Sequence, residues 1–244
     1  MKMKGKLFIM VAALMSAFTL SSCLGDSETM EYPTYERMVT VGPGALYLYS
    51  DGGELLKPTN TVTGLDKVER AVVAFDVVPA ELNGTKLESG KSYDITMNPN
   101  YCYSVPTQKI INLHDNAAAV DSLENTQDPI AYVENLYVKN GYLTAYLSYN
   151  MNRFGSYYID MAYDAETDVD PSTNTITFTL YYDNKADYGD ISMKYPFSFR
   201  MPMEAYDKLP AEEVNVVVRY KTEHFNYSTV TCKMKKSDFN TPIY

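Results

Sequence analysis

The sequence predicts an all-β protein with two domains, the second of them an antiparallel β-sandwich. In the second half of the chain, apolar and polar residues alternate with a period of two, which is typical of strands that bury one face. Turn residues separate the strand-like segments at short intervals, which favours a sandwich or a barrel over a helical fold. No long amphipathic helix interrupts this pattern.

Five strand-like segments in the first half predict a separate small domain. They are Arg37–Val41, Ala45–Tyr49, Val68–Val78, Tyr93–Met97 and Tyr101–Leu113, the last with a break at Pro106. Glycine-rich turns follow the first two segments. Five strands in so short a span fit a small barrel, including the five-stranded Greek-key barrel of the OB-fold. Composition does not choose between this barrel and a small sandwich.

A polar segment with a short alanine run, residues 114–125, separates the two halves. This segment predicts a linker or one short helix, and we place the domain boundary near residue 120. The first domain would then span residues 36–120 and the second residues 121–244.

Three alternating segments define the core face of the second domain. Their apolar positions are Ile176, Phe178, Leu180 and Tyr182; Met193, Tyr195, Phe197, Phe199 and Met201; and Val214, Val216, Val218 and Tyr220. Asn140-Gly141 predicts a two-residue hairpin turn. Pro196, on the outward face of its strand, predicts a sheet edge or a bulge. With further strands at Tyr157–Tyr163 and Ser228–Met234, about seven strands result, which fits a β-sandwich.

The N-terminus predicts an exported protein. Three lysines precede an apolar run from Leu7 to Leu20, and small residues follow it. The run is shorter than the roughly 20 residues of a transmembrane helix, so residues 1–22 fit a signal peptide better. Leu20-Ser21-Ser22-Cys23 resembles the lipobox of bacterial lipoproteins, which implies cleavage before Cys23 and diacylglycerol on its sulfur. The alternative is a plain signal peptide followed by an unrelated cysteine.

Polar residues after Cys23 predict a lipidated tether over residues 23–35, because this segment has no hydrophobic period. The scattered acidic residues Asp26, Glu28 and Glu31 resemble the surface-export signal of Bacteroidetes lipoproteins. This resemblance implies lipid anchoring in the outer membrane at the cell surface. The periplasmic leaflet of that membrane is the alternative.

The net charge of the chain disfavours certain classes of binding partner. The chain has 21 Lys+Arg and 31 Asp+Glu, a net charge of −10, and removal of residues 1–22, which hold three lysines and no acidic residue, makes it −13. Such an acidic body repels nucleic acid and anionic lipid headgroups. We therefore expect no nucleic-acid partner, and we expect the membrane contact to come from the lipid on Cys23. The 23 tyrosines fit either strand propensity or a recognition surface.

The sequence carries no recognisable catalytic, metal-binding or cofactor-binding signature. Acidic residues stand at every second position from Asp164 to Asp170, but the segment lacks the Gly and Glu that an EF-hand needs, so we interpret it as an acidic loop. Gly90-Lys91-Ser92 lacks the spacing and the following helix of a P-loop. Cys102 and Cys232 fit two buried thiols better than a disulfide. We therefore expect a protein that is not an enzyme and binds neither metal nor cofactor.

Several segments together match one known pattern. The lipobox is followed by Leu46-Tyr47-Leu48-Tyr49-Ser50-Asp51-Gly52-Gly53-Glu54-Leu55-Leu56-Lys57-Pro58, by a long strand that opens at Arg70-Ala71-Val72-Val73, and by Gly141-Tyr142-Leu143-Thr144 after a hairpin. This pattern resembles the NigD-like lipoproteins of Bacteroidetes over nearly the whole mature chain. The resemblance implies an OB-like N-terminal domain and a C-terminal β-sandwich. It also implies an immunity role, because the family is named after a component of a bacteriocin gene cluster, and it brings no catalytic residues.

From these observations we expect a cell-envelope lipoprotein that acts as a non-enzymatic binding or interaction module. Bacteriocin immunity is one form of that role, and the partner is an unknown protein or glycan. The alternative function is a surface lipoprotein that binds or processes glycans. The candidate binding surface consists of Tyr142, Tyr146, Tyr158 and Tyr181, because outward-facing tyrosines can build an aromatic platform. The same rings could instead pack between the sheets or against the other domain.

Asp121-Ser122-Leu123 resembles the short acceptor sequence for O-glycosylation that Bacteroidetes use on exported proteins. Its place in the segment between the domains fits an accessible acceptor. The resemblance implies that Ser122 is a candidate for glycosylation.

Overall fold

The computed structural model describes residues 33–114, 116–124, 128–152, 156–184, 191–224 and 226–239. Residues from Pro33 onward form one compact unit. The expected signal peptide, the lipidation site Cys23 and most of the expected tether lie outside the described residues.

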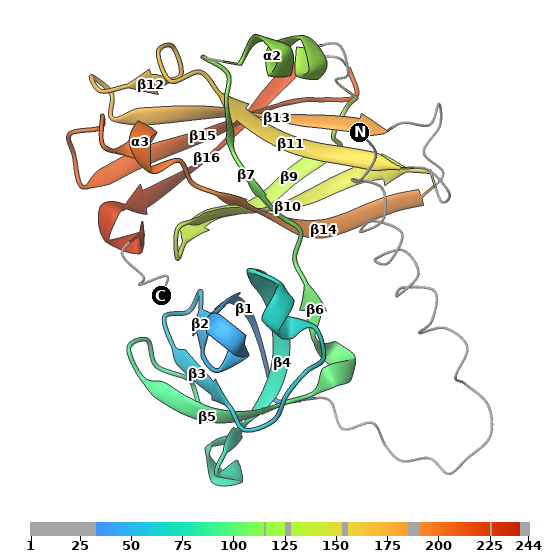
Figure 1. The fold of residues 1–244 in the computed structure, drawn as a ribbon, viewed down its shortest axis with the longest axis vertical. Helices are drawn as coiled ribbons and strands as arrows, with labels where there is room; N and C mark the ends of the chain where they lie inside the picture. The colour runs from blue at the N-terminus through green and yellow to red at the C-terminus, as the bar shows by residue number, and fades with distance from the viewer. Residues whose placement is uncertain are drawn as a thin grey trace. The chain divides into compact units, whose positions relative to one another are not determined.

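The first half of this unit is a closed five-stranded barrel, with its strands blue to green in Figure 1. The strand order is β1-β2-β3-β5-β4, and pairing of β4 with β1 closes the sheet on itself. Pairs are antiparallel except β3 with β5. Its strands are β1 (Tyr35–Val41), β2 (Leu48–Ser50), β3 (Leu55–Pro58), β4 (Arg70–Val78) and β5 (Ser92–Met97), with β6 (Tyr103–Ser104) added to the edge of β4. This confirms the barrel rather than the small sandwich.

The barrel differs from the expected strands at β2 and β3. The expected strand over Ala45–Tyr49 begins only at Leu48, because Pro43–Ala45 form a 3₁₀ turn, η1. Strand β3 was not expected, because its four residues end in Lys57-Pro58 and show no clear alternation.

The second half is a two-sheet sandwich, drawn in green to red (Figure 1). One sheet has the order β7-β14-β10-β9, and the other has the order β16-β15-β13-β11-β8, with β12 paired to β13. Most pairs are antiparallel, but β7 with β14, β8 with β11, and β13 with β15 are parallel. The strands are β7 (Thr107–Lys109), β8 (Ile111–Asn112), β9 (Tyr132–Lys139), β10 (Tyr142–Met151), β11 (Tyr157–Tyr163), β12 (Val169–Asp170), β13 (Thr175–Asn184), β14 (Ile191–Arg200), β15 (Glu213–Lys221) and β16 (Tyr227–Lys235).

The chain changes from the barrel sheet to the sandwich sheets between β6 and β7, ahead of the boundary expected near residue 120. Strand β7 pairs with the end of β14, and β8 pairs with the end of β11. Both are very short strands at sheet edges, and residues 101–113 read as one interrupted strand in the sequence. Only the tertiary pairing assigns them to the sandwich.

Helices are few and short. The segment between the halves forms α2 (Ala117–Glu124), which agrees with one of the two expected alternatives, and α3 (Met203–Tyr206) is a single turn. The remaining 3₁₀ turns are η2 (Leu65–Lys67), η3 (Ala80–Leu82), η4 (Pro99–Tyr101) and η5 (Lys236–Phe239). Within the described ranges, none of the helices has the length and apolar character needed to cross a bilayer.

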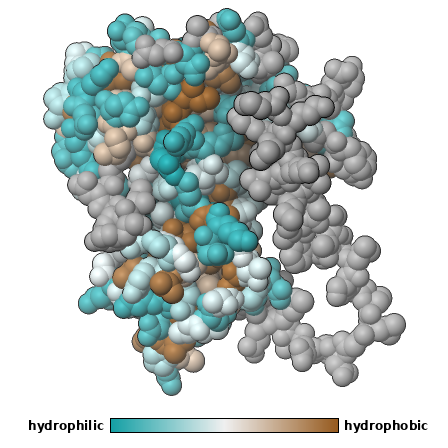
Figure 2. All heavy atoms as spheres, viewed as in Figure 1, coloured by the Kyte–Doolittle hydropathy of each residue, from teal (hydrophilic) through white to brown (hydrophobic). Residues whose placement is uncertain are grey.

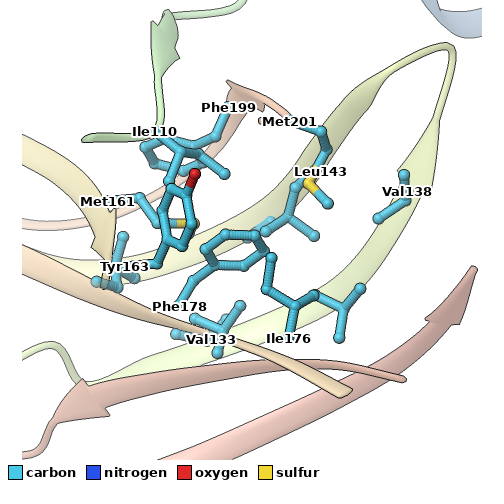
Figure 3. Close-up of a cluster of buried hydrophobic side chains, with 14 of the residues drawn as sticks. Ile110, Val133, Val138, Leu143, Met161, Tyr163, Ile176, Phe178, Phe199 and Met201 are labelled. Atoms are coloured by element: carbon cyan, nitrogen blue, oxygen red, sulfur yellow. The ribbon is translucent and has the colours of Figure 1, made fainter. Parts of the chain in front are cut away.

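The barrel and the sandwich have separate hydrophobic cores. The expected apolar faces of β13, β14 and β15 point into the sandwich core, where most of them are buried. Figure 3 shows how side chains from both sheets meet there: Phe178 of β13 lies close to Leu143 of β10 and Tyr163 of β11. The Tyr163 and Phe178 rings pack edge to face with centroids 5.7 Å apart, a geometry that adds to the burial of apolar area.

Hydrophilic residues cover much of the described surface on the face shown in Figure 2, with apolar residues in small separate patches. Single exposed apolar residues are normal for a folded protein. On this face, particular side-chain arrangements are therefore better candidates for a functional site than one large apolar surface.

Candidate functional site

The structure places the first two candidate tyrosines at the contact between the sandwich and the barrel. Tyr142 of β10 is only 2 % exposed, and its hydroxyl donates a hydrogen bond to Glu69 Oε2 at 3.0 Å. Tyr146, four residues further along β10 on the same face, is half-buried. Burial and the charges of Glu36 and Asp51 raise its pKa. Tyr142 therefore packs against the barrel, which was the alternative interpretation, and its ring offers little surface to a ligand.

Arg70 lies at the centre of this contact and is fully buried. Its guanidinium donates two hydrogen bonds to the carboxylate of Asp51, at 2.7 and 2.5 Å, and one to Thr40 Oγ1 at 2.9 Å. On the sandwich side it donates to Thr144 Oγ1 at 3.2 Å and lies 5.2 Å from the centroid of the Tyr142 ring. A bidentate pair of this kind fixes both distance and orientation.

Further sandwich groups bind the same carboxylate. The hydroxyl of Tyr137 donates to Asp51 Oδ2 at 2.9 Å, and the side-chain amide of Asn140 donates to Asp51 Oδ1 at 3.2 Å. Burial and the neighbouring Asp51 charge raise the pKa of Tyr137, so this phenol stays protonated and keeps donating. The network joins the barrel to the sandwich through side chains that bind one another. We assign it a structural role.

The other two candidate tyrosines lie on the opposite sheet of the sandwich, on its outer face. In the antiparallel pairing of β11 with β13, Tyr158 is opposite Asp183 and Asp160 is opposite Tyr181. Since alternate residues of a strand share a face, all four side chains lie on the same side of this sheet. Two tyrosines and two aspartates therefore occupy alternating corners of a small square, which we call the Tyr–Asp square.

The Tyr–Asp square lines a hollow of about 280 Å³. Helix α2 provides one wall with Ser122 and Leu123, and Figure 1 shows it at the top of the view, next to β13 and β11. Leu123 packs with Ala162 and Tyr181 in a small apolar cluster that holds the helix to the sheet. Tyr158 is 49 % exposed, whereas Tyr181 is 7 % exposed. One ring therefore forms the rim of the hollow, and the other belongs to its floor.

Asp160 is the chemically distinctive group of the hollow. Burial raises the pKa of its carboxyl group, because desolvation disfavours the charged form. In the described part of the chain, no hydrogen bond or ion pair reaches this carboxylate. A desolvated acid in a cleft, beside aromatic rings, is a candidate binding group.

The four sequence-predicted tyrosines thus form two separate pairs rather than one platform. Tyr142 and Tyr146 lie together on β10, and Tyr158 and Tyr181 lie together on β11 and β13. The sequence analysis missed Asp160 and Asp183. The alternation of Thr175, Thr177 and Thr179 on the outward face would have placed Tyr181 and Asp183 there, but only the strand register brings Asp160 beside them. Cys23 lies outside the described residues.

The acidic segment that begins at Asp164 uses its carboxylates to stabilise turns. Asp164 Oδ1 accepts a hydrogen bond from the backbone of Glu166, and Asp168 Oδ2 accepts one from the backbone of Asp164. Hydrogen bonds from Ser172 and Thr173 lower the pKa of Asp170 to about 2. Among the described residues, no three or more His, Cys, Asp or Glu side chains are grouped to hold a metal ion.

Cys102 and Cys232 are both free thiols. Cys102 packs against the barrel core and Cys232 against the sandwich core. Burial raises the pKa of Cys102, and it raises that of Cys232 to about 12, so neither thiol has the lowered pKa of a reactive cysteine.

Comparison with known protein families identifies the second half of the chain. Residues 110–234 match the family described as the NigD-like C-terminal beta sandwich domain. The match begins between β7 and β8 and ends within β16, so it covers most of both sandwich sheets. Among curated proteins, none matches the chain significantly.

Solved structures share the fold of the whole described unit. A NigD-like immunity protein from Bacteroides caccae has a TM-score of 0.60 and 18 % identity, over 84 % of this chain and 99 % of that one. A protein described as toxin-related from Parabacteroides distasonis has a TM-score of 0.58 and 20 % identity, over 84 % and 94 %. A protein from Bacteroides fragilis described as a lipoprotein has a TM-score of 0.52 and 11 % identity, over 82 % and 96 %. At these identities the likeness shows the fold alone.

Proposed function

We propose that this chain, which belongs to the NigD-like family, is a non-enzymatic binding module of the cell envelope that recognises a protein partner in an immunity-like role. The observation that carries this proposal is the hollow of the Tyr–Asp square. Its floor and rim present rings and carboxylates, which are groups that bind rather than groups arranged as nucleophile and base. The immunity protein of the same fold supports a protein as the partner.

The partner test uses intact cells that produce the full chain, treated with a membrane-permeant cross-linker that reaches both leaflets of the outer membrane. We expect a discrete protein adduct that is lost in the Asp160→Asn variant and retained in the Asp94→Asn variant, whose exposed carboxylate lies on barrel strand β5. Mass spectrometry identifies the adduct. Absence of any protein adduct with the wild-type chain would refute the proposed function.

Membrane attachment through Cys23 is part of the same proposal. Two or more acyl chains on one cysteine hold a protein firmly in a membrane, since each buried CH₂ contributes about 0.8 kcal/mol. The Cys23→Ser variant should therefore move from the membrane fraction to the soluble fraction, with an unchanged thermal midpoint. Protease treatment of intact cells separates the cell-surface location from the periplasmic leaflet, because only surface protein is digested.

A glycan is the second candidate ligand. The half-exposed ring of Tyr158 beside two carboxylates is suited to stack on a sugar ring whose hydroxyls donate to the acids. A glycan array probed with the full chain tests this alternative. Specific retention that Tyr158→Ala abolishes would favour the glycan over the protein partner.

A further inference from the structure

The Tyr–Asp square has a charge that its own surroundings leave uncompensated. Asp160 is partly desolvated, and no hydrogen bond or ion pair joins it to another described residue. Arg219 lies on β15, which pairs with β13, but its guanidinium contacts other groups. It donates to Thr179 Oγ1 at 2.8 Å and lies 5.2 Å from the ring centroid of Tyr227. A ligand that carries positive charge would offset the cost of burying Asp160.

The tyrosines narrow the chemistry of that ligand. Aromatic rings attract cations through their faces, and this attraction strengthens where water is excluded. A guanidinium also stacks flat on a ring and donates two parallel hydrogen bonds to a carboxylate, which an ammonium group cannot do in the same geometry. The combination of half-exposed Tyr158 with Asp160 therefore suits an arginine side chain better than a lysine side chain.

The molecule already contains one arginine that binds a carboxylate and an aromatic ring together. Arg70 binds the Asp51 carboxylate with two donors while its guanidinium lies beside the Tyr142 ring. The Tyr–Asp square presents the same kinds of acid and ring on an accessible face. The net charge of −10 further favours approach of a basic partner over an acidic one.

We infer that the hollow of the Tyr–Asp square receives an arginine side chain of the partner protein. This inference rests on the proposed protein-binding function and specifies the group that is recognised. The hollow, at about 280 Å³, suits one side chain and not a whole structural element.

The test is ligand-observed NMR with the full chain in detergent micelles at about 150 mM NaCl, where long-range attraction between charges is screened. The probe is a seven-residue Gly/Ser peptide with one central arginine, and the matched peptide carries citrulline, which has the same shape without the charge. We expect saturation transfer to the arginine side chain and much weaker transfer to citrulline. Equal binding of both peptides would overturn the inference.

Three variants locate the binding. Asp160→Asn and Tyr158→Ala should each weaken arginine-peptide binding at least tenfold, whereas Asp94→Asn, which removes the same charge from an exposed barrel position, should change it less than twofold. Thermal melts confirm that each variant folds. Equal losses in Asp160→Asn and Asp94→Asn would mean general charge attraction and would overturn the inference.

The cross-linking experiment separates the two proposals. An arginine peptide that binds through Asp160, with no protein adduct on cells, would show that the hollow recognises arginine but would refute the proposed function, and with it the assignment of that arginine to a protein partner. A protein adduct that persists in Asp160→Asn, together with unchanged peptide binding, would support a protein partner and overturn the inference.

Discussion

At the scale of single residues, two charged side chains differ in whether the fold supplies them with binding partners. Arg70 is fully buried and bound on both sides of the contact between barrel and sandwich, whereas Asp160 is partly buried and bound to no other described residue. A buried charge with good partners fixes a structure, and a buried charge without them lowers stability until a ligand binds. Replacing each residue by an uncharged one should therefore change the stability of the fold in opposite directions.

Replacing Arg70 by Met should lower the free energy of unfolding by about 3–5 kcal/mol, because the partly buried carboxylate of Asp51 would lose its cation. Urea unfolding measures this change. The control is Lys194→Met, which breaks the exposed pair with Glu134 and should cost less than about 1 kcal/mol. Similar losses in both variants would contradict the structural role of Arg70.

Replacing Asp160 by Asn should raise the thermal midpoint by about 2 °C at about pH 7, because the charged form is disfavoured by burial in the folded state. The sign follows from the pKa. Since the pKa of Asp160 is raised in the fold, the wild type gains stability relative to the variant as the pH falls through that pKa towards the ordinary value of 3.8. The difference between the two midpoints should therefore shrink on acidification. A difference independent of pH would contradict this account.

At the scale of elements, the β9–β10 hairpin shows how local sequence positions the polar network. Asn140 and Gly141 both have positive φ, 53° and 79°, as a two-residue turn of this type requires. The side chain of Asn140 then donates to Asp51, and the strands that leave the turn carry Tyr137 and Thr144 to the Arg70 network. The turn thus sets both the register of the hairpin and the place of the network.

Replacing Gly141 by Ala should lower the free energy of unfolding by about 1 kcal/mol. A Cβ at this position would meet no atom within 4 Å, so the cost comes from the left-handed backbone conformation and not from a clash. Gly141→Asn is the matched control, because asparagine tolerates positive φ better than alanine. Chemical denaturation should rank the loss for alanine above that for asparagine, and the reverse order would exclude backbone strain as the cause.

Strand β14 shows a second local effect. Pro196 is paired on one side with Tyr146 of β10, while β7 pairs only with Ser198–Arg200 on the other side. Pro196 therefore lies where the described part of the sheet has an open edge, as a residue without a backbone N–H requires. The proline limits how far β7 can pair along β14.

At the scale of the whole described unit, two hydrophobic cores are joined by polar contacts. Apart from the Arg70 network, Arg200 forms an ion pair with Glu69, and the Tyr195 hydroxyl donates to the carbonyl of Ser104 at 2.9 Å. Separating the barrel from the sandwich would expose the charged groups of this contact without separating either core. Whether the two cores unfold together therefore depends on these polar contacts, and a single substitution can remove one of them.

We expect the wild-type chain to unfold in one cooperative transition, because loss of either core also breaks the Arg70 network. In the Arg70→Met variant the transition should broaden or divide into two, since the cores would then melt more independently. Differential scanning calorimetry measures this through the ratio of calorimetric to van't Hoff enthalpy. A ratio near one in both proteins would show that the coupling does not depend on Arg70.

The sequence by itself determined the all-β class, the buried faces of β13, β14 and β15, the Asn140-Gly141 turn and the family resemblance. These follow from neighbours along the chain: a period of two and a residue pair with unusual backbone freedom are local properties. The expected lipid anchor at Cys23 is also a local inference, and it remains a prediction.

The tertiary structure alone decided which distant residues meet. Arg70 reads as the first residue of a strand, and nothing nearby in the sequence indicates that Asp51 and Thr144 will surround it. Likewise, Asp160 joins Tyr181 only through the register of β11 with β13, and β7 and β8 join the sandwich only through parallel pairing at its edges. The physical reason is that strand pairing and charge burial depend on contacts between residues far apart in the chain, which local periodicity does not encode.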